Sequence, residues 1–149
     1  MSNLRVDDLQ LKGRNGKPLS IMQNPKWFCF GIDAVLLSGF AKVKKNECVL
    51  DLCSGTGIIA VLLSAKTNAK HIDAVEIQNE MCELAQKTVS YNELDDVISV
   101  KNADLKEYKN EYLYDSIVCN PPYKEIGGGD VTEVKQIAVS RNEVLWAGE

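Results

Sequence analysis

A chain of 149 residues, 45% hydrophobic and 26% charged, has room for one domain with a sizeable apolar core. Its composition excludes a membrane protein, because no stretch approaches the roughly 20 apolar residues of a membrane span, and we expect no signal peptide. The five cysteines include no Cys-x-x-Cys pair, so neither a disulfide framework nor a metal site is indicated. We therefore expect a cytoplasmic protein with reduced thiols.

The net charge of −4 is distributed unevenly along the chain. Residues 1–45 contain eight Lys or Arg residues and three Asp residues, which gives this segment a net charge of +5. We predict a basic N-terminal unit over residues 1–45 and a second unit over residues 46–149. An acidic chain argues against nonspecific binding to nucleic acid, but a basic leading segment can still meet phosphates locally. A solvated hairpin with lysines on its outer face explains the same pattern.

The elements follow one another in an order typical of an α/β protein. Strands are predicted at 8–12 and 18–23 around the hairpin turn signal Asn15-Gly16, and a helix from Ile32 to Val43. Strands then alternate with helices, the strands at 48–52, 71–77, 97–101 and 115–119 and the helices at 57–66 and 79–91. Such alternation implies right-handed crossovers and a parallel sheet. We predict a Rossmann-like, mostly parallel sheet preceded by a hairpin and a helix.

A glycine turn joins the first strand of this sheet to the helix that follows it. Gly55 and Gly57 permit a tight turn and a close approach of the backbone to a ligand, which then meets the free N–H groups of the helix N-terminus. The spacing matches a dinucleotide-binding Gly-x-Gly-x-x-Gly only with Ala60 in the third position, and the Lys-Ser/Thr of a phosphate-binding loop is absent. Asp51, just before the turn, can accept a hydrogen bond from an amino group of a ligand.

An acidic residue ends the next predicted core strand. Glu76 follows the glycines by about twenty positions, where a carboxylate binds the ribose hydroxyls of a nucleoside. The carboxyl ends of parallel strands meet at one edge of the sheet, and ligands bind at that edge. The glycine turn, Glu76, Asp104 and Asn120 all fall at such ends. The sequence therefore predicts a nucleoside site there.

Residues 120–123 read Asn-Pro-Pro-Tyr and directly follow the last predicted strand. Each proline fixes its own φ and pushes the preceding residue into an extended conformation, so the loop is stiff. It holds the Asn120 amide, the carbonyl oxygens of Asn120 and Pro121 and the Tyr123 ring in fixed relative positions. Two acceptors and a flat ring suit a planar NH2 group attached to a π-system. An ordinary proline turn explains the tetrapeptide alone, but the glycine turn and Glu76 upstream favour the amine site.

Together these residues resemble the S-adenosylmethionine-dependent methyltransferases of the Rossmann-like class that modify NH2 groups through an Asn-Pro-Pro-Tyr loop. The segment from Phe30 to Leu37 is similar to one that precedes the core in the small-domain type, as in the bacterial tRNA(Val) adenine-N6-methyltransferases. Cys53 departs from the family pattern, where glycine or alanine is frequent, and Ile32 stands where a hydroxyl residue is common. The resemblance implies a cofactor site made of Asp51, Cys53, Ser54, Gly55, Gly57, Glu76, Ile77, Asp104, Leu105 and Asn120.

The resemblance also implies the reaction, a transfer of the methyl group of S-adenosylmethionine to the exocyclic N6 amine of an adenine in tRNA, without a metal. Asn120, Pro121, Pro122 and Tyr123 are the implied catalytic residues. The Asn120 side-chain oxygen and the Pro121 carbonyl accept hydrogen bonds from the NH2 group, while Tyr123 stacks on the base. A glutamine side-chain amide in a translation factor presents the same planar NH2, so its methylation is an alternative. A non-catalytic cofactor-binding fragment is a second one.

The family fold has more strands than the core strands predicted here. We therefore expect an N-terminal fragment of a longer protein, with the C-terminal strands missing. The strand at 115–119 is then left without one of its neighbours. Because an exposed apolar edge is a template for pairing with another chain, we expect self-association through this edge.

Overall fold

The computed structural model describes residues 3–27, 29–110 and 113–121. Its centre is a four-stranded sheet with the order β5-β4-β3-β6, in which all neighbouring strands are parallel. The strands are β3 (Cys48–Leu52), β4 (His71–Glu76), β5 (Ile98–Asn102) and β6 (Ser116–Cys119). Their bounds lie within one residue of the predicted ones, and the predicted α/β fold with a parallel sheet is confirmed.

The strands differ in how deeply they are buried. The central β3 and β4 are buried nearly throughout because a parallel strand with neighbours on both sides is covered on both faces. Among the described residues β6 pairs only with β3, and the Ile117 side chain is 61% exposed. Within the described residues β6 is therefore an edge strand of this sheet, whereas β3 is paired on both sides.

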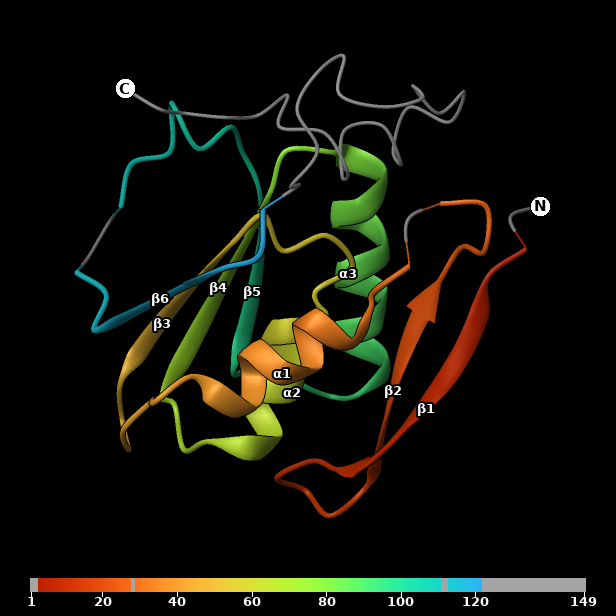
Figure 1. Ribbon diagram of the computed structural model, residues 1–149, viewed down its shortest axis with the longest axis horizontal. Helices are drawn as coiled ribbons and strands as arrows, with labels where there is room; N and C mark the ends of the chain where they lie inside the picture. The colour runs from red at the N-terminus through yellow and green to blue at the C-terminus, as the bar shows by residue number, and fades with distance from the viewer. Residues whose placement is uncertain (1–2, 28, 111–112, 122–149) are drawn as a thin grey trace.

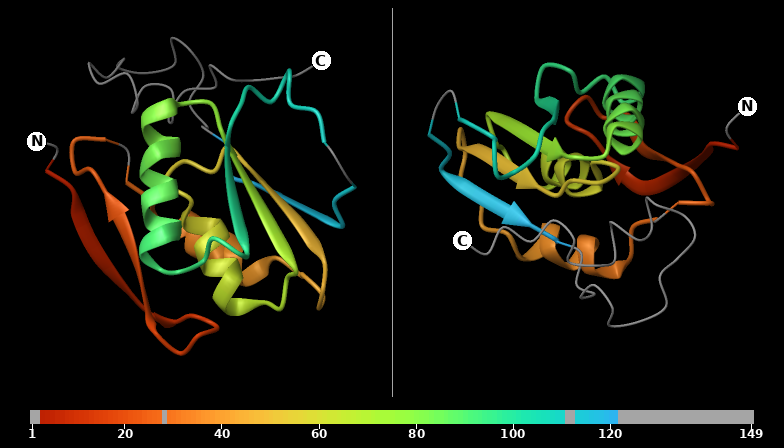
Figure 2. Two further views of the ribbon diagram at one scale, coloured as in Figure 1. Left: turned by 180° about the vertical axis from the view of Figure 1, so that it is seen from behind. Right: turned by 90° about the horizontal axis from the view of Figure 1, so that it is seen from above.

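Three helices form a layer on one face of the sheet (Figures 1 and 2). They are α1 (Ile32–Phe40), α2 (Ile58–Lys66) and α3 (Asn79–Tyr91). In α2 every residue from Ile58 to Ser64 is buried, as its uniformly apolar sequence requires. The first helix ends three residues before the predicted end at Val43, with Ala41 already extended, and Gly39 in its last turn weakens the helix there.

The N-terminal hairpin forms a further layer outside α3 (Figure 2). Its strands β1 (Arg5–Lys12) and β2 (Pro18–Gln23) are antiparallel, and β1 begins three residues before its predicted start. The turn lies where Asn15-Gly16 predicted it, with Gly16 at a φ of +77°. Leu19 and Ile21 of β2 join the same apolar core as the sheet, so residues 1–45 fold against the rest. The domain boundary after residue 45 stays a prediction.

Two basic residues of the N-terminal segment, Arg14 and Lys17, make contacts with other parts of the same chain. The Arg14 guanidinium donates hydrogen bonds to the carbonyl oxygens of Ser64 (2.7 Å), Thr67 (3.2 Å) and Ala69 (2.7 Å) at the C-terminal end of α2. The Lys17 ammonium lies 2.5 Å from the Glu93 carboxylate. These charges fasten the hairpin to the core, so the net charge of the segment overstates what is free to meet phosphates.

The opposite face of the sheet carries a polar contact with the chain that follows β5. The Tyr114 hydroxyl donates a hydrogen bond to the buried Asp73 carboxylate of β4, and the Tyr108 and Tyr114 hydroxyls lie 2.9 Å apart. His71 Nε2 is 2.9 Å from the other Asp73 oxygen. The only histidine of the chain thus has a structural partner far from the predicted site. No helix within the described residues is long and apolar enough to cross a membrane.

Candidate active site

The carboxyl ends of the four parallel strands lie at one edge of the sheet (Figure 1). The glycine turn follows β3, Glu76 ends β4, Asp104 follows β5 and Asn120 follows β6. Gly55 and Asn120, which are 65 positions apart in the sequence, therefore share one edge, as the predicted alternation of strands and helices required.

The glycine turn has a backbone that only small residues adopt without strain. Gly55 has a φ of +55° and Gly57, at the N-terminus of α2, a φ of +81°. A Cβ atom on Gly57 would lie 3.3 Å from the Ala85 Cβ, so this glycine also lets α2 approach α3 closely. Within the part of the chain that the structure describes, no neighbouring atom lies within 4 Å of the position that a Gly55 Cβ would occupy, which leaves room for a ligand against the turn.

Glu76 fixes the glycine turn from the neighbouring strand. One carboxylate oxygen accepts a hydrogen bond from the Gly55 N–H at 2.7 Å, and the other accepts one from the Gln78 N–H at 2.9 Å. The side chain is only 4% exposed, and this burial raises the pKa of the carboxyl above its ordinary value, opposed by the two backbone donors. Each oxygen has a second lone pair, which a ribose hydroxyl can use.

Asp51 lies beneath the same turn in a very different environment. Its side chain is fully buried, and within the described residues neither carboxylate oxygen has a hydrogen-bond partner. The buried Ser54 hydroxyl likewise has no hydrogen-bond partner within the described residues. Burial raises the pKa of the Asp51 carboxyl well above its ordinary value, the neighbouring Cys119 and Glu76 add to this, and the backbone N–H of Ala60 in α2 opposes it. Buried polar groups in proteins are nearly always paired, so these three orphaned atoms indicate a ligand with a donor group.

A cavity opens between the glycine turn, the N-terminus of α1 and the end of β6. Asn120 lines it from β6 and Met81 from α3. The remaining lining residues come from the start of α1 and from the turn into α2, and they are Phe30, Gly31, Ala34, Cys53, Ser54, Gly55, Thr56, Ile58 and Ile59. The cavity thus joins the predicted nucleoside edge to the predicted amine-binding residue.

Asn120 is oriented by a residue from the other wall of the cavity. Its Nδ2 donates a hydrogen bond to the Asp33 carboxylate in the first turn of α1, at 2.8 Å. A carboxylate is an acceptor only, so the amide nitrogen faces Asp33 and the Asn120 Oδ1 points the other way. The side chain therefore offers an acceptor, rather than a donor, on its side away from α1.

The remaining predicted site residues are more peripheral. Asp104 accepts a hydrogen bond from the Lys106 N–H (2.9 Å) in the turn after β5, and neither it nor Ile77 or Leu105 lines the cavity. Pro121 is described and half-buried, whereas Pro122 and Tyr123 lie outside the described residues. Of the predicted set, Cys53, Ser54, Gly55 and Asn120 meet around the cavity, with Asp51, Gly57 and Glu76 directly behind the turn.

Residues 30–148 match the model of one protein family, described as the methyltransferase small domain. The chain belongs to this family. Among curated relatives, the tRNA1(Val) (adenine(37)-N6)-methyltransferase of Flavobacterium psychrophilum is 36% identical over 72% of the chain and 47% of its own length. The enzyme of the same name from Vibrio campbellii is 24% identical over 93% of the chain and 57% of its own length. The chain thus spans about half the length of the curated relatives it matches.

Solved structures of similar fold include Trm5 of Methanocaldococcus jannaschii in complex with adenosine, with a TM-score of 0.63 and 21% identity over 83% of this chain and 36% of that one. A putative transferase of Pyrococcus horikoshii has a TM-score of 0.63 and 18% identity over 95% of this chain and 50% of that one. At these identities the likeness concerns the fold. It agrees with the Rossmann-like sheet described above.

Two polar residues of this methyltransferase small domain were not among the predicted site residues. Asp33 lay within the segment that carried the family resemblance, yet no local pattern linked it to Asn120, 87 positions away. Asn102 Nδ2 donates to the carbonyl oxygens of Glu76 (3.0 Å) and Ile77 (3.1 Å) and thereby fixes the end of β4. Both roles depend on which strands become neighbours, and spacing along the chain does not reveal that.

Proposed function

We propose that this chain carries the cofactor site and the amine-binding loop of an S-adenosylmethionine-dependent N-methyltransferase that acts on the exocyclic N6 amine of an adenine in tRNA. The observation that carries the proposal is the fully buried Asp51 carboxylate, without a hydrogen-bond partner within the described residues, beneath a glycine turn that shares one cavity with Asn120, whose amide nitrogen donates to Asp33. The names of the curated relatives support RNA rather than a glutamine amide as substrate.

The donors and acceptors of the site fit S-adenosylmethionine. The Asp51 carboxylate and the Ser54 hydroxyl lack partners within the described residues and suit the charged ends of the methionine moiety, whose α-amino group is a donor. Glu76 suits the ribose hydroxyls. When bound, the cofactor supplies a sulfonium-linked methyl group that needs only a nucleophile in line with it.

The chain's own contribution to the reaction is to orient a poor nucleophile. The lone pair of an adenine NH2 group is delocalised into the ring. Hydrogen bonds from that group to the Asn120 Oδ1 and the Pro121 carbonyl favour a pyramidal nitrogen and stabilise the positive charge that develops on it. Asp33 holds the Asn120 amide in the orientation that makes this possible. Positioning of the nitrogen supplies much of the remaining rate.

Calorimetry with S-adenosylhomocysteine, the demethylated product, tests cofactor binding by the 149-residue chain. We expect binding by the native chain and by Asn120→Ala, with affinities within a few-fold of each other, because Asn120 faces the amine. Transfer of a labelled methyl group to tRNA, measured with a full-length protein that carries this site, should be nearly abolished in Asn120→Ala. Normal turnover by that variant would contradict the amine-binding role, and absence of product binding by the native chain would contradict the cofactor site.

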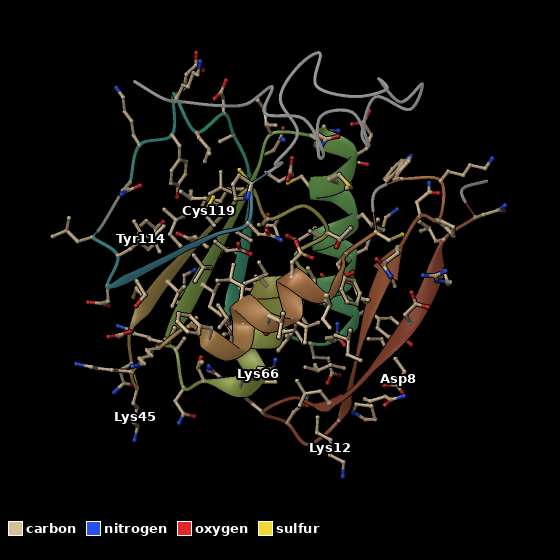
Figure 3. All side chains as sticks on the ribbon, in the orientation of Figure 1. Asp8, Lys12, Lys45, Lys66, Tyr114 and Cys119 are labelled. Carbon is tan, nitrogen blue, oxygen red and sulfur yellow. The ribbon has the colours of Figure 1, made fainter. Side chains whose placement is uncertain are left out.

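Replacement of Asp33 tests the orientation of Asn120. In Asp33→Ala the amide loses the group that fixes its nitrogen, so kcat for tRNA methylation should fall by about tenfold, as expected for a lost positioning hydrogen bond of about 1.4 kcal/mol. Cofactor affinity should not change. Asp8→Ala, an exposed acidic residue of β1 at the far side of the molecule, is the control (Figure 3). Equal rates in the two variants would contradict the role of Asp33.

The basic residues can be divided by their distance from the site. Lys12 and Lys45 lie at the end of the molecule opposite to the carboxyl ends of the strands (Figure 3). Lys26 is exposed in the turn that leads to Phe30 and Gly31 in the cavity wall. We propose that Lys26 contacts RNA phosphate. Lys26→Glu should weaken tRNA binding several-fold. It should also reduce the slope of log K against log salt concentration by about one, which corresponds to one released counterion fewer. Lys12→Glu should leave both the affinity and the slope unchanged.

A cofactor-binding fragment without turnover is the second candidate, and the observation that favours it is the bare edge of β6. Within the described residues the edge is flanked by a groove that Leu37, Phe40, Val43 and Ile117 line. Self-association of the 149-residue chain through this edge remains our prediction. Sedimentation should detect dimers that Ile117→Lys abolishes, and a monomer at all concentrations would contradict it. Methylation of tRNA by the isolated chain would rule out the non-catalytic alternative.

A further inference from the structure

Two cysteines lie side by side where β3 and β6 reach the active-site edge. Leu52 of β3 and Cys119 of β6 are register partners, and Cys53 is the next residue after Leu52. Cys53 has a φ of +55°, a left-handed conformation that costs a non-glycine residue about 1–2 kcal/mol. This conformation ends the alternation of the strand at the point where β3 lies beside Cys119 of β6.

The spacing of the two residues suits a disulfide. Neighbouring strands lie about 4.8 Å apart and one residue along a strand adds about 3.3 Å, so Cα atoms in this diagonal relation are about 6 Å apart, within the range of about 4.4–6.8 Å for bridged cysteines. The pair also lies between two hollows of the surface. Cys53 lines the cavity that Asn120 shares, and Cys119 lines the groove between α1 and β6. Reagents can therefore reach the pair from the groove side, where Cys119 is exposed.

The two thiols are chemically unequal. The hydrogen bond with Cys53 lowers the pKa of Cys119, because a thiolate at Cys119 accepts it, against the opposing effect of partial burial. The pKa of Cys53 is raised by the same hydrogen bond and by burial, and the carboxylates of Glu76 and Asp51 add to this. Cys119 is thus the nucleophile of the pair, and Cys53 is the resolving thiol that attacks the oxidised Cys119.

We propose that Cys53 and Cys119 are a redox-sensitive dithiol that a peroxide converts into an intramolecular disulfide. The Cys119 thiolate attacks one oxygen of hydrogen peroxide, the O–O bond breaks, and a sulfenic acid and hydroxide form; the hydroxide becomes water by taking up the proton that Cys119 lost on ionisation. The Cys53 sulfur then attacks the Cys119 sulfur, the S–O bond breaks, and the second water leaves with the Cys53 proton. The two thiols lose two electrons together, and the peroxide is reduced to two waters. A small dithiol such as dithiothreitol reverses the change by exchange.

Oxidation should change the neighbouring site, a consequence that rests on the proposed function. Cys53 leads directly into the glycine turn and Cys119 directly into Asn120. A covalent S–S bond of about 2.05 Å draws these two segments together and displaces the turn amides from their ligand geometry. We expect the affinity for S-adenosylhomocysteine to fall about tenfold on oxidation and to recover on reduction, which corresponds to about 1.4 kcal/mol.

The disulfide can be mapped without altering the chain. Cleavage on the amino side of aspartate places every cysteine on its own peptide, with Cys53 on residues 51–72 and Cys119 on residues 115–129. After peroxide treatment and alkylation of free thiols, we expect a cross-linked species of these two peptides, lighter by about 2 Da than their sum. Cys29, Cys48 and Cys82 should be alkylated as before. Oxidation of Cys119 alone to sulfinic acid, or cross-links distributed among other cysteines, would overturn the proposal.

A trivalent arsenical provides a second measurement that needs no oxidant. Phenylarsine oxide bridges two adjacent thiols with loss of water, so it should protect both cysteines of the pair from alkylation until dithiothreitol is added. Cys119→Ser should lose this protection and the response of product affinity to peroxide, whereas Cys48→Ser, at the other end of β3, should keep both. Arsenical protection in Cys119→Ser would contradict the pairing. If the reduced native chain does not bind S-adenosylhomocysteine, the proposed function fails while the mapped disulfide stands.

Discussion

Two buried carboxylates lie next to the same glycine turn, Asp51 from the strand that precedes it and Glu76 from the neighbouring strand, and their surroundings differ. Both oxygens of Glu76 accept hydrogen bonds from backbone N–H groups, whereas neither oxygen of Asp51 has a partner within the described residues. Both side chains are buried, Asp51 completely. Burial alone therefore does not distinguish them, and the distribution of backbone donors does.

The difference indicates a structural role for Glu76 and a ligand-binding role for Asp51. Glu76 stabilises the turn because its two oxygens accept hydrogen bonds from backbone N–H groups that would otherwise be unsatisfied, and these bonds oppose the rise in its pKa that burial causes. Asp51 costs free energy in the isolated protein, since a buried carboxylate without donors is unfavourable in either protonation state. A group that destabilises the isolated fold and has partners only in a complex is typical of a functional site. Substitutions at the two positions should therefore have opposite effects on stability.

The largest effect is expected for ligand binding by Asp51→Asn. The amide loses the charge that pairs with an α-amino group, and a charge-assisted hydrogen bond contributes about 2–3 kcal/mol. The affinity for S-adenosylhomocysteine should fall roughly 100-fold in calorimetry. An affinity within threefold of the native value would show that Asp51 does not contact the ligand, and would contradict the contrast drawn with Glu76.

The same Asp51→Asn variant should be more stable than the native chain at neutral pH, by on the order of 1 kcal/mol, because it removes a buried carboxylate without partners. The pKa of this carboxyl is raised in the folded state from its ordinary value of 3.8. The native chain therefore loses stability, relative to the variant, as pH rises through the raised pKa, and the difference disappears below about pH 4, where the carboxyl is protonated in both states. Thermal melting of both proteins from pH 4 to pH 8 measures this difference. A constant difference across that range would contradict an unpaired carboxylate.

Glu76→Gln should have the opposite effect on stability. The amide replaces one acceptor with an NH2 group that faces the N–H of Gly55 or of Gln78, so the free energy of unfolding should fall by about 1–2 kcal/mol. Affinity for the product should fall about tenfold, since both the turn and the ribose contact are weakened. Denaturant unfolding provides the measurement, with Glu80→Gln, exposed in the first turn of α3, as a matched control. A free energy of unfolding of Glu76→Gln equal to that of the native chain would contradict the structural role of Glu76.

Ser54→Ala should give the smallest effect and sharpen the comparison. The Ser54 hydroxyl has no partner within the described residues, so its removal should change the free energy of unfolding by less than about 0.5 kcal/mol. Affinity for the product should fall about three- to fivefold, as for loss of one neutral hydrogen bond of about 1 kcal/mol. A clear loss of stability would show that the hydroxyl has a structural partner.

The sequence by itself determined the strands, the helices and the edge at which the site lies. Apolar runs such as residues 48–52 end in turn residues, and this pattern is local, so each core strand was predicted to within one residue. The positions of Gly55 and Gly57 follow from the same local logic, because their positive φ values exclude most other residues. The family resemblance lay in motifs of a few consecutive residues, and the match over residues 30–148 agrees with it.

The tertiary structure alone decided which polar groups are paired. Nothing along the chain distinguishes Asp51, whose oxygens have no hydrogen-bond partner within the described residues, from Glu76, whose oxygens accept from Gly55 and Gln78. The position of the turn that supplies these donors depends on the packing of β3 against β4. The contact of Asp33 with Asn120 and that of Cys53 with Cys119 likewise join segments that meet only when β6 pairs with β3. Backbone propensity acts over a few residues, whereas hydrogen-bond satisfaction is a property of the folded interior.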